Sequence, residues 1–174
     1  MSTSSPTQKL ASADRRGDSV VLLRARIDAW LADYVDCLDS KRIDEWPDFF
    51  EEECFYTILP KENEALGLEL GLIRCESRAM LKDRAYAIKK TAMYGPRDIR
   101  HFFTGLVIRG AVPDCIHAES NFLIVETQND ALPRVFAVGR SYDEIRPVGD
   151  GFRFKTRRCV YTSNLIPNTL IIPI

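Results

Sequence analysis

Histidine is scarce in this sequence: His101 and His117 are the only two among 174 residues. An iron site built from two histidines and one carboxylate would use both, with Asp114 or Glu119 as the acid. An iron–sulfur cluster held by two cysteines and two histidines would need closely paired motifs, which the sequence lacks. Two histidines cannot supply both kinds of centre, and their spacing does not favour metal ligation.

The cysteines also lack a pattern that carries chemistry. They are odd in number, irregularly spaced and without a C-x-x-C pair, so we expect reduced, buried thiols. The sequence has no G-x-S-x-G elbow and no glycine-rich phosphate loop. We therefore predict no catalytic residue, no cofactor-binding residue and no metal ligand in this chain. The cysteines are Cys37, Cys54, Cys75, Cys115 and Cys159.

Long apolar runs are missing as well, because no uncharged segment approaches the length that crosses a bilayer. The Ser/Thr-rich N-terminus lacks the apolar stretch of a secretory signal. With 24 basic and 25 acidic residues the net charge is -1, so no global field attracts nucleic acid or an anionic membrane. We predict a cytoplasmic protein that binds neither.

The amino-acid composition, with 45% hydrophobic and 28% charged residues, is typical of a folded globular protein. Residues 1–17 have too few apolar side chains to order themselves, and we expect a flexible N-terminal arm. The remaining length, residues 18–174, suits a single domain with one sizeable core.

The spacing of apolar residues predicts three helices. The first begins at Asp18 or Ser19 and runs for about five turns. A short second helix is capped by Asp44, and the third begins at Ser77 and stops at Gly95. The third helix presents one apolar face, formed by Leu81, Ala85, Ile88 and Ala92.

Five β-type segments complete the pattern: 54–59, 101–109, 115–127, 134–146 and 151–163. Short turns separate the last four, so consecutive strands should be antiparallel neighbours. Helices followed by such a meander predict an α+β fold with the helices packed on the apolar face of a strongly curved sheet.

Arginines are concentrated around these strands. Phe152 and Phe154 alternate with Arg153 and Arg157, which predicts that the last strand carries its arginines on a polar outer face. Such arginines either pair with acids such as Asp143 in solvent or contact another subunit through their planar guanidinium groups. The set comprises Arg97, Arg100, Arg109, Arg140, Arg146, Arg153, Arg157 and Arg158.

Two features leave alternatives open. The segment 165–174 is apolar and contains prolines, so it should be buried as an edge strand or in a subunit contact. A general base in a cavity would be His101, Asp83, Glu119 or Asp143. For each of these four, a satisfied or solvent-facing polar group on the fold is the commoner arrangement.

Several short motifs follow one another over residues 22–174. The sequence of motifs resembles the small (beta) subunits of Rieske-type aromatic-ring-hydroxylating dioxygenases. The motifs are Trp46-Pro47-Asp48-Phe49-Phe50 with Cys54-Phe55-Tyr56, Met80-Leu81-Lys82-Asp83-Arg84, Arg97-Asp98-Ile99-Arg100-His101-Phe102, Ser120-Asn121-Phe122, Val138-Gly139-Arg140 with Tyr142-Asp143, and Gly151-Phe152 leading to Arg157-Arg158.

The resemblance implies a cystatin-like, NTF2-like cone and a trimer of small subunits that supports three large (alpha) subunits. The large subunits would carry the Rieske 2Fe-2S cluster and the mononuclear iron, with electrons from NADH delivered through a reductase. The small subunit would be structural in a hetero-oligomer of aromatic hydrocarbon catabolism. Residues 67–73, followed by Glu76-Ser77, look more like the branch that acts on aromatic acids such as terephthalate, salicylate or anthranilate.

On this reading seven residues are candidate subunit contacts. The alternatives are a stand-alone NTF2-like isomerase or dehydratase with His101 or Asp83 as a cavity base, and a binding module with the same fold. The candidate contacts are Arg97, Arg100, Arg140, Arg157, Arg158, Ile171 and Ile172.

Overall fold

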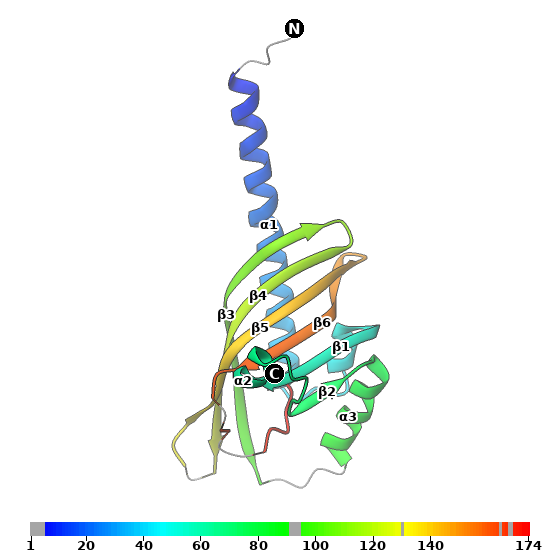
Figure 1. The fold of residues 1–174 in the computed structure, drawn as a ribbon, viewed down its shortest axis with the longest axis vertical. Coiled ribbons are helices and arrows are strands. Elements are labelled where there is room, and N and C mark those ends of the chain that lie inside the picture. The colour runs from blue at the N-terminus through cyan, green and yellow to red at the C-terminus, as the bar shows by residue number, and fades with distance from the viewer. Residues whose placement is uncertain (1–5, 91–94, 130, 164, 167–168) are drawn as a thin grey trace.

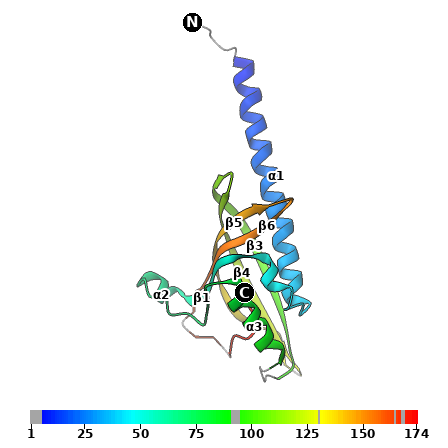
Figure 2. The same cartoon turned by 90° about the vertical axis from the view of Figure 1, so that its right-hand side faces the viewer.

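The computed structural model describes residues 6–90, 95–129, 131–163, 165–166 and 169–174, with side chains from Ser19 onward. One twisted sheet of six strands forms the body, and helix α1 (Pro6–Asp39) lies along one of its faces (Figure 1). Turning the molecule by 90° shows the helix on one side of the sheet and α2 on the other (Figure 2).

The C-terminal half of α1 packs on the sheet because its apolar side chains recur every three or four residues. Ile27, Leu31, Tyr34 and Leu38 are all buried, with Ile27 and Tyr34 fully inaccessible. The N-terminal half extends beyond the sheet (Figure 1).

The helix starts earlier than its sequence predicted. It begins at Pro6, so the predicted start at Asp18 or Ser19 was wrong. Proline is tolerated in the first turn of a helix, where its missing N–H has no partner to lose. Gly17 costs a helix interior about 1 kcal/mol but does not end it. Residues 1–5 of the predicted arm lie outside the described residues.

Five shorter elements follow α1. The predicted short helix forms with Pro47 in its first turn, but Glu45 precedes it and makes no side-chain cap bond, so the predicted cap at Asp44 was wrong. Residues 91–94, which include Ala92 of the predicted third helix, lie outside the described residues. The elements are η1 (Trp46–Phe49), β1 (Phe50–Pro60), α2 (Lys61–Ala65), β2 (Ile73–Cys75) and α3 (Arg78–Lys90).

The four long strands form the antiparallel meander that the sequence predicted: β3 (Arg97–Val112), β4 (Cys115–Gln128), β5 (Arg134–Val148) and β6 (Gly151–Tyr161). The strand order is β2-β1-β6-β5-β4-β3, and β1 pairs with β6 in parallel. Helix α1 packed on one face of a curved, mainly antiparallel sheet confirms the predicted α+β fold, although α2 lies on the other side of the sheet.

A β-bulge in β6 changes which of its side chains face the core. The pairing passes from Ile145 with Phe154 to Glu144 with Thr156, so the intervening Lys155 has no register partner. One extra residue moves the following side chains to the opposite face of the sheet. Arg157 therefore points inward and is fully buried, and its predicted place on the outer face was wrong.

Aromatic rings from three elements pack together in the core. Trp30 lies 4.5 Å from Phe154 between ring centroids, and Phe154 lies 5.1 Å from Phe50. Tyr34 makes edge contacts with both phenylalanines, at 5.4 and 6.5 Å. Tilted and edge-on pairs of this kind add to the free energy gained by burying their area. They fix α1 against β1 and β6.

Candidate functional site

The inner face of the sheet carries a buried ion pair. Arg157 Nη1 donates to Asp143 Oδ2 at 2.8 Å, and neither side chain has more than 1% of its area exposed. Three aromatic rings surround the guanidinium, those of Tyr34, Phe103 and Phe154, with centroids 4.6–4.7 Å from its carbon. The positive charge is thus held by one carboxylate and three ring faces.

Burial sets the protonation of this pair. Removal from water raises the pKa of Asp143 to about 6, although the charge of Arg157 and the hydroxyl of Ser141 act in the opposite direction. Burial also disfavours the charged form of Arg157, but the negative charge of Asp143 holds the pKa of the guanidinium above its usual range. Burial also raises the pKa of Tyr34 and Tyr56, so both phenols stay protonated and can donate.

The main chain of Ile174 reaches this interior. Its main-chain oxygen accepts hydrogen bonds from the hydroxyls of Tyr34 at 2.8 Å and Tyr56 at 3.0 Å, and from Arg157 Nε at 3.4 Å. The thiol of Cys159 lies 3.7 Å from the same oxygen. The sequence predicted burial of this segment at a sheet edge or a subunit contact, but residues 169–174 form no strand and enter the cone instead.

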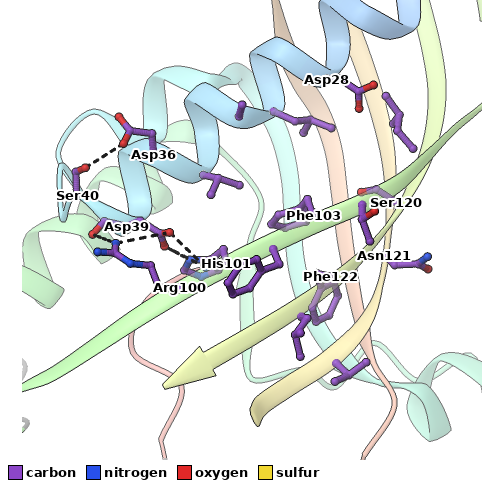
Figure 3. A pocket seen from close by; sticks show the side chains of 18 residues that line it. Asp28, Asp36, Asp39, Ser40, Arg100, His101, Phe103, Ser120, Asn121 and Phe122 are labelled. Carbon is purple, nitrogen blue, oxygen red and sulfur yellow. Dashed lines mark hydrogen bonds and ion pairs between the residues drawn. The ribbon is translucent and has the colours of Figure 1, made fainter. Parts of the chain in front are cut away.

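His101 joins α1, β3 and the C-terminal segment (Figure 3). Its Nδ1 lies 2.7 Å from Asp39 Oδ1, and its Nε2 lies 3.0 Å from the carbonyl oxygen of Pro173. Both ring nitrogens therefore face oxygen acceptors, and both can donate only in the imidazolium form. This arrangement leaves no free ring nitrogen on His101 for the role of a cavity base.

An open groove of about 990 Å³ lies beside this contact, between α1 and strands β3 and β4 (Figure 3). Its lining includes Phe103, and its acidic side chains on α1 are already paired. Asp36 accepts from Arg42 at 2.7 Å, and Asp39 accepts from His101. The groove is thus an apolar surface with a charged rim, and these two acids are not available as free bases.

The other candidate acids and histidine are dispersed. Asp83 and Asp114 are exposed on α3 and on the β3–β4 turn. His117 pairs with Gly110 in the sheet, whereas His101 pairs with a residue of β4 seven positions further on, so roughly 20 Å separates them. Among the described residues no three His, Cys, Asp or Glu side chains gather as metal ligands.

The predicted contact arginines divide into buried and exposed ones. Arg157 has no surface, so its assignment as a subunit contact was wrong: its charge is used inside the chain. Arg97 is 8% exposed and pairs with Glu126 at 2.9 Å. Arg100 and Arg140 keep 61% and 46% of their side chains exposed. The exposed pair could meet another polypeptide, whereas the buried arginines hold the fold.

The remaining predicted contacts are intermediate. Arg158 is 31% exposed and forms an ion pair with Glu64. Ile171 and Ile172 are half-buried, while Ile174 beside them is 1% exposed.

The sequence does not identify Tyr34 or Tyr56 as polar groups of the interior, because phenols on a helix and a strand have the pattern of ordinary core aromatic residues.

Comparison with known proteins decides the family: residues 34–168 match the model of the ring hydroxylating beta subunit. The chain belongs to this family. It is 35% identical over 141 residues to the anthranilate 1,2-dioxygenase small subunit of Burkholderia cepacia, covering 81% of this chain and 88% of the relative. It is 26% identical over 149 residues to subunit beta 1 of the terephthalate 1,2-dioxygenase terminal oxygenase component of Comamonas sp, covering 86% and 97%.

Solved structures agree. The "beta subunit of a putative aromatic-ring-hydroxylating dioxygenase" of Novosphingobium aromaticivorans superposes with a TM-score of 0.81 at 32% identity, covering 90% of this chain and 99% of that one. Naphthalene 1,2-dioxygenase gives 0.74 at 16% identity, covering 99% and 100%, which concerns the fold alone. The predicted NTF2-like cone and the predicted membership of the beta-subunit family are both confirmed.

This beta subunit is a non-catalytic part of an oxidoreductase complex whose large alpha subunit is its partner. Its own donor groups do not fit a Rieske cluster or a mononuclear iron, because His101 is committed to Asp39 and Pro173 and His117 lies far from it. None of the described helices is both long enough and apolar enough to cross a membrane.

Proposed function

We propose that this beta subunit forms a trimer that supports three alpha subunits in an α3β3 hexamer acting on a carboxylated aromatic ring. The observation that carries the substrate class is the 35% identity to an anthranilate dioxygenase small subunit over most of both chains. The alpha subunit would hold the Rieske 2Fe-2S cluster and the mononuclear iron, and NADH would supply electrons through a reductase. The complex would work in the cytoplasm, in aromatic catabolism.

The outer face of β3, β4 and β5 is the surface that we assign to subunit contacts. Phe102 pairs across the sheet with Leu123, and Leu123 pairs with Val138, so three apolar side chains form a row on this face. Phe102 and Val138 are 53% and 44% exposed. Arg140 and Tyr142 continue the face along β5 and are also exposed. An apolar row beside exposed arginine and tyrosine is typical of protein interfaces.

Arg100 and the half-buried Ile171 and Ile172 would contribute beside this row, because Arg100 lies two residues from Phe102 on β3, the strand that contacts the C-terminal segment through His101. Arg100 Nη1 donates to the main-chain oxygen of Asp39 at 3.3 Å and keeps most of its side chain in solvent. This arrangement presents a fixed positive charge to a partner without first breaking a buried bond.

Native mass spectrometry of the chain co-expressed with its alpha subunit tests the assembly. We expect a complex of three copies of each chain, and a one-to-one heterodimer would contradict the proposal. Turnover of anthranilate, salicylate and terephthalate by the purified complex, supplied with NADH and a reductase, tests the substrate class. Activity confined to uncharged hydrocarbons such as naphthalene would exclude the carboxylated class.

A further inference from the structure

The interior of the cone has the composition of a binding site. Tyr34, Tyr56 and Arg157 direct their donors at one point, and the thiol of Cys159 lies beside it. Arg157 Nη2 is also buried there, and none of the residues that the structure describes is its hydrogen-bond partner. Two phenols and a guanidinium that converge on one oxygen are the groups with which proteins bind a carboxylate or a carbonyl.

A residue of the chain itself, Ile174, lies where these donors converge. Ile174 presents its main-chain oxygen to the donors, and its N–H donates to the hydroxyl of Tyr56 at 2.8 Å. Its side chain is 1% exposed among the aromatic residues of the core. Ile174 thus combines a polar head with an apolar body, as a small bound molecule would.

We propose that the cone interior is a binding site for a carboxylate or carbonyl oxygen carried on an apolar body, and that residues 170–174 occupy it as a tethered ligand. The proposal concerns the interior of this chain and does not depend on the hexamer or on its substrate.

The way in which the segment is held supports a tethered ligand. Residues 169–174 have irregular backbone, without helix or strand. Side chains from five elements hold it. Besides Tyr34 on α1 and Arg157 on β6, these are His101 on β3, which bonds Pro173, Arg84 on α3, which reaches the oxygen of Leu170 at 3.4 Å, and Tyr56 on β1, which bonds Ile174 in both directions. A segment held by side chains can leave a site without breaking the sheet.

The first test uses the full chain and hydrogen exchange of the Ile174 amide. Tyr56→Phe keeps the ring but removes the hydroxyl that both accepts from this amide and donates to its carbonyl, so we expect exchange to speed up about tenfold or more. The matched control is Tyr86→Phe, which removes an exposed hydroxyl on α3 and should leave this rate unchanged. An unchanged rate in Tyr56→Phe overturns the proposal.

The second test uses a chain that ends at Thr169, with the peptide Leu-Ile-Ile-Pro-Ile or benzoate added in solution. We expect saturable binding of the peptide with a rise in melting temperature, and weaker binding of benzoate, which shares the carboxylate and an apolar body. Adding Tyr56→Phe should weaken the binding of both compounds by about tenfold, whereas adding Tyr86→Phe should not. If the shortened chain is unfolded alone, peptide-dependent folding is the equivalent supporting result. Failure of both compounds to bind overturns the proposal.

Discussion

Two glutamates on the same strand, β4, each hold two arginines, and one of these glutamates is buried in the fold whereas the other reaches its surface. The side chain of Glu126 has no exposed area and bonds Arg97 at 2.9 Å and Arg134 at 2.6 Å. The side chain of Glu119 is 20% exposed and bonds Arg109 at 2.9 Å and Arg140 at 3.3 Å. The same chemical groups are therefore used for two purposes on the two faces of one sheet.

The two glutamate sites differ in whether water can solvate a charged group after its ion-pair partner is removed. At Glu119 water can solvate the carboxylate and both guanidinium groups, so the ion pairs contribute little to stability and can be exchanged for pairs with another subunit. At Glu126 water has no access to the carboxylate, and loss of the anion leaves the buried charge of Arg97 with weaker compensation, whereas Arg134 is 44% exposed. The inner face thus stabilises this chain, while the outer face is available to other chains.

The largest expected effect is that of Arg157→Met, which removes the most deeply buried charge. Asp143 would lose the cation that pairs with it, and the rings of Tyr34, Phe103 and Phe154 would contact the uncharged side chain of methionine. We expect the free energy of unfolding to fall by about 5 kcal/mol, since breaking a buried ion pair is strongly destabilising. Urea denaturation measures this change.

Arg153→Met is the matched control, because Arg153 lies on the same strand before the bulge and is only half-buried. Its free energy of unfolding should change by less than about 0.5 kcal/mol. Equal effects of the two substitutions would show that burial does not distinguish them. A normally stable Arg157→Met chain that no longer assembles would place Arg157 in an interface after all.

A smaller loss is expected for Glu126→Gln. The amide keeps the shape of the side chain but not its charge, so Arg97 and Arg134 would meet a neutral oxygen, and we expect a loss of about 3 kcal/mol. The identical change on the outer face, Glu119→Gln, should cost less than about 1 kcal/mol. Thermal and urea unfolding of both variants compare the two faces directly, and a larger loss for Glu119→Gln would reverse the assignment.

The outer face was the more predictable of the two from sequence. In β4 the side chains alternate between buried and accessible along almost its full length, from Ile116 to Glu126, as the period of two requires. The strand segments and their antiparallel order followed from this alternation and from the turns between them. Arg100 and Arg140 also lie at the surface, as expected of arginines on strands.

The interior depended on features that one strand does not reveal. Arg157 enters the core because Lys155 is an extra residue relative to the partner strand, and a bulge is defined only by the pairing of two strands. The apolar C-terminal segment was expected to be buried, but its length and composition did not specify where. The donors that fix Ile174 come from residues 34, 56 and 157, which only the folded chain brings together.

The pH dependence of stability tests the buried carboxyl of Asp143. Its folded-state pKa of about 6 lies above the ordinary value of 3.8, so the protonated form favours the folded state. The resulting stabilisation is fully present below about pH 4 and is lost as the pH rises through about 6. The stability difference between the native chain and Asp143→Asn should therefore fall by at most about 3 kcal/mol between pH 4 and pH 7. A difference that grows over this range would mean that Arg157 holds the carboxyl ionised throughout.

The smallest effect on stability, and a clear effect on assembly, is expected for Arg140→Glu. Arg140 lies beside the apolar row of Phe102 and Val138 and is 46% exposed, so reversing its charge should change the free energy of unfolding by less than about 1 kcal/mol. The same reversal in a subunit contact places like charges together and should weaken assembly by about tenfold or more, as measured by native mass spectrometry over a dilution series.

Arg24→Glu is the control, because it makes the same charge change on an exposed side of α1, away from the sheet, and should leave assembly unchanged. Equal loss of assembly in both variants would point to net charge rather than to this face, and no loss in either would remove the outer face of β5 from the subunit contacts.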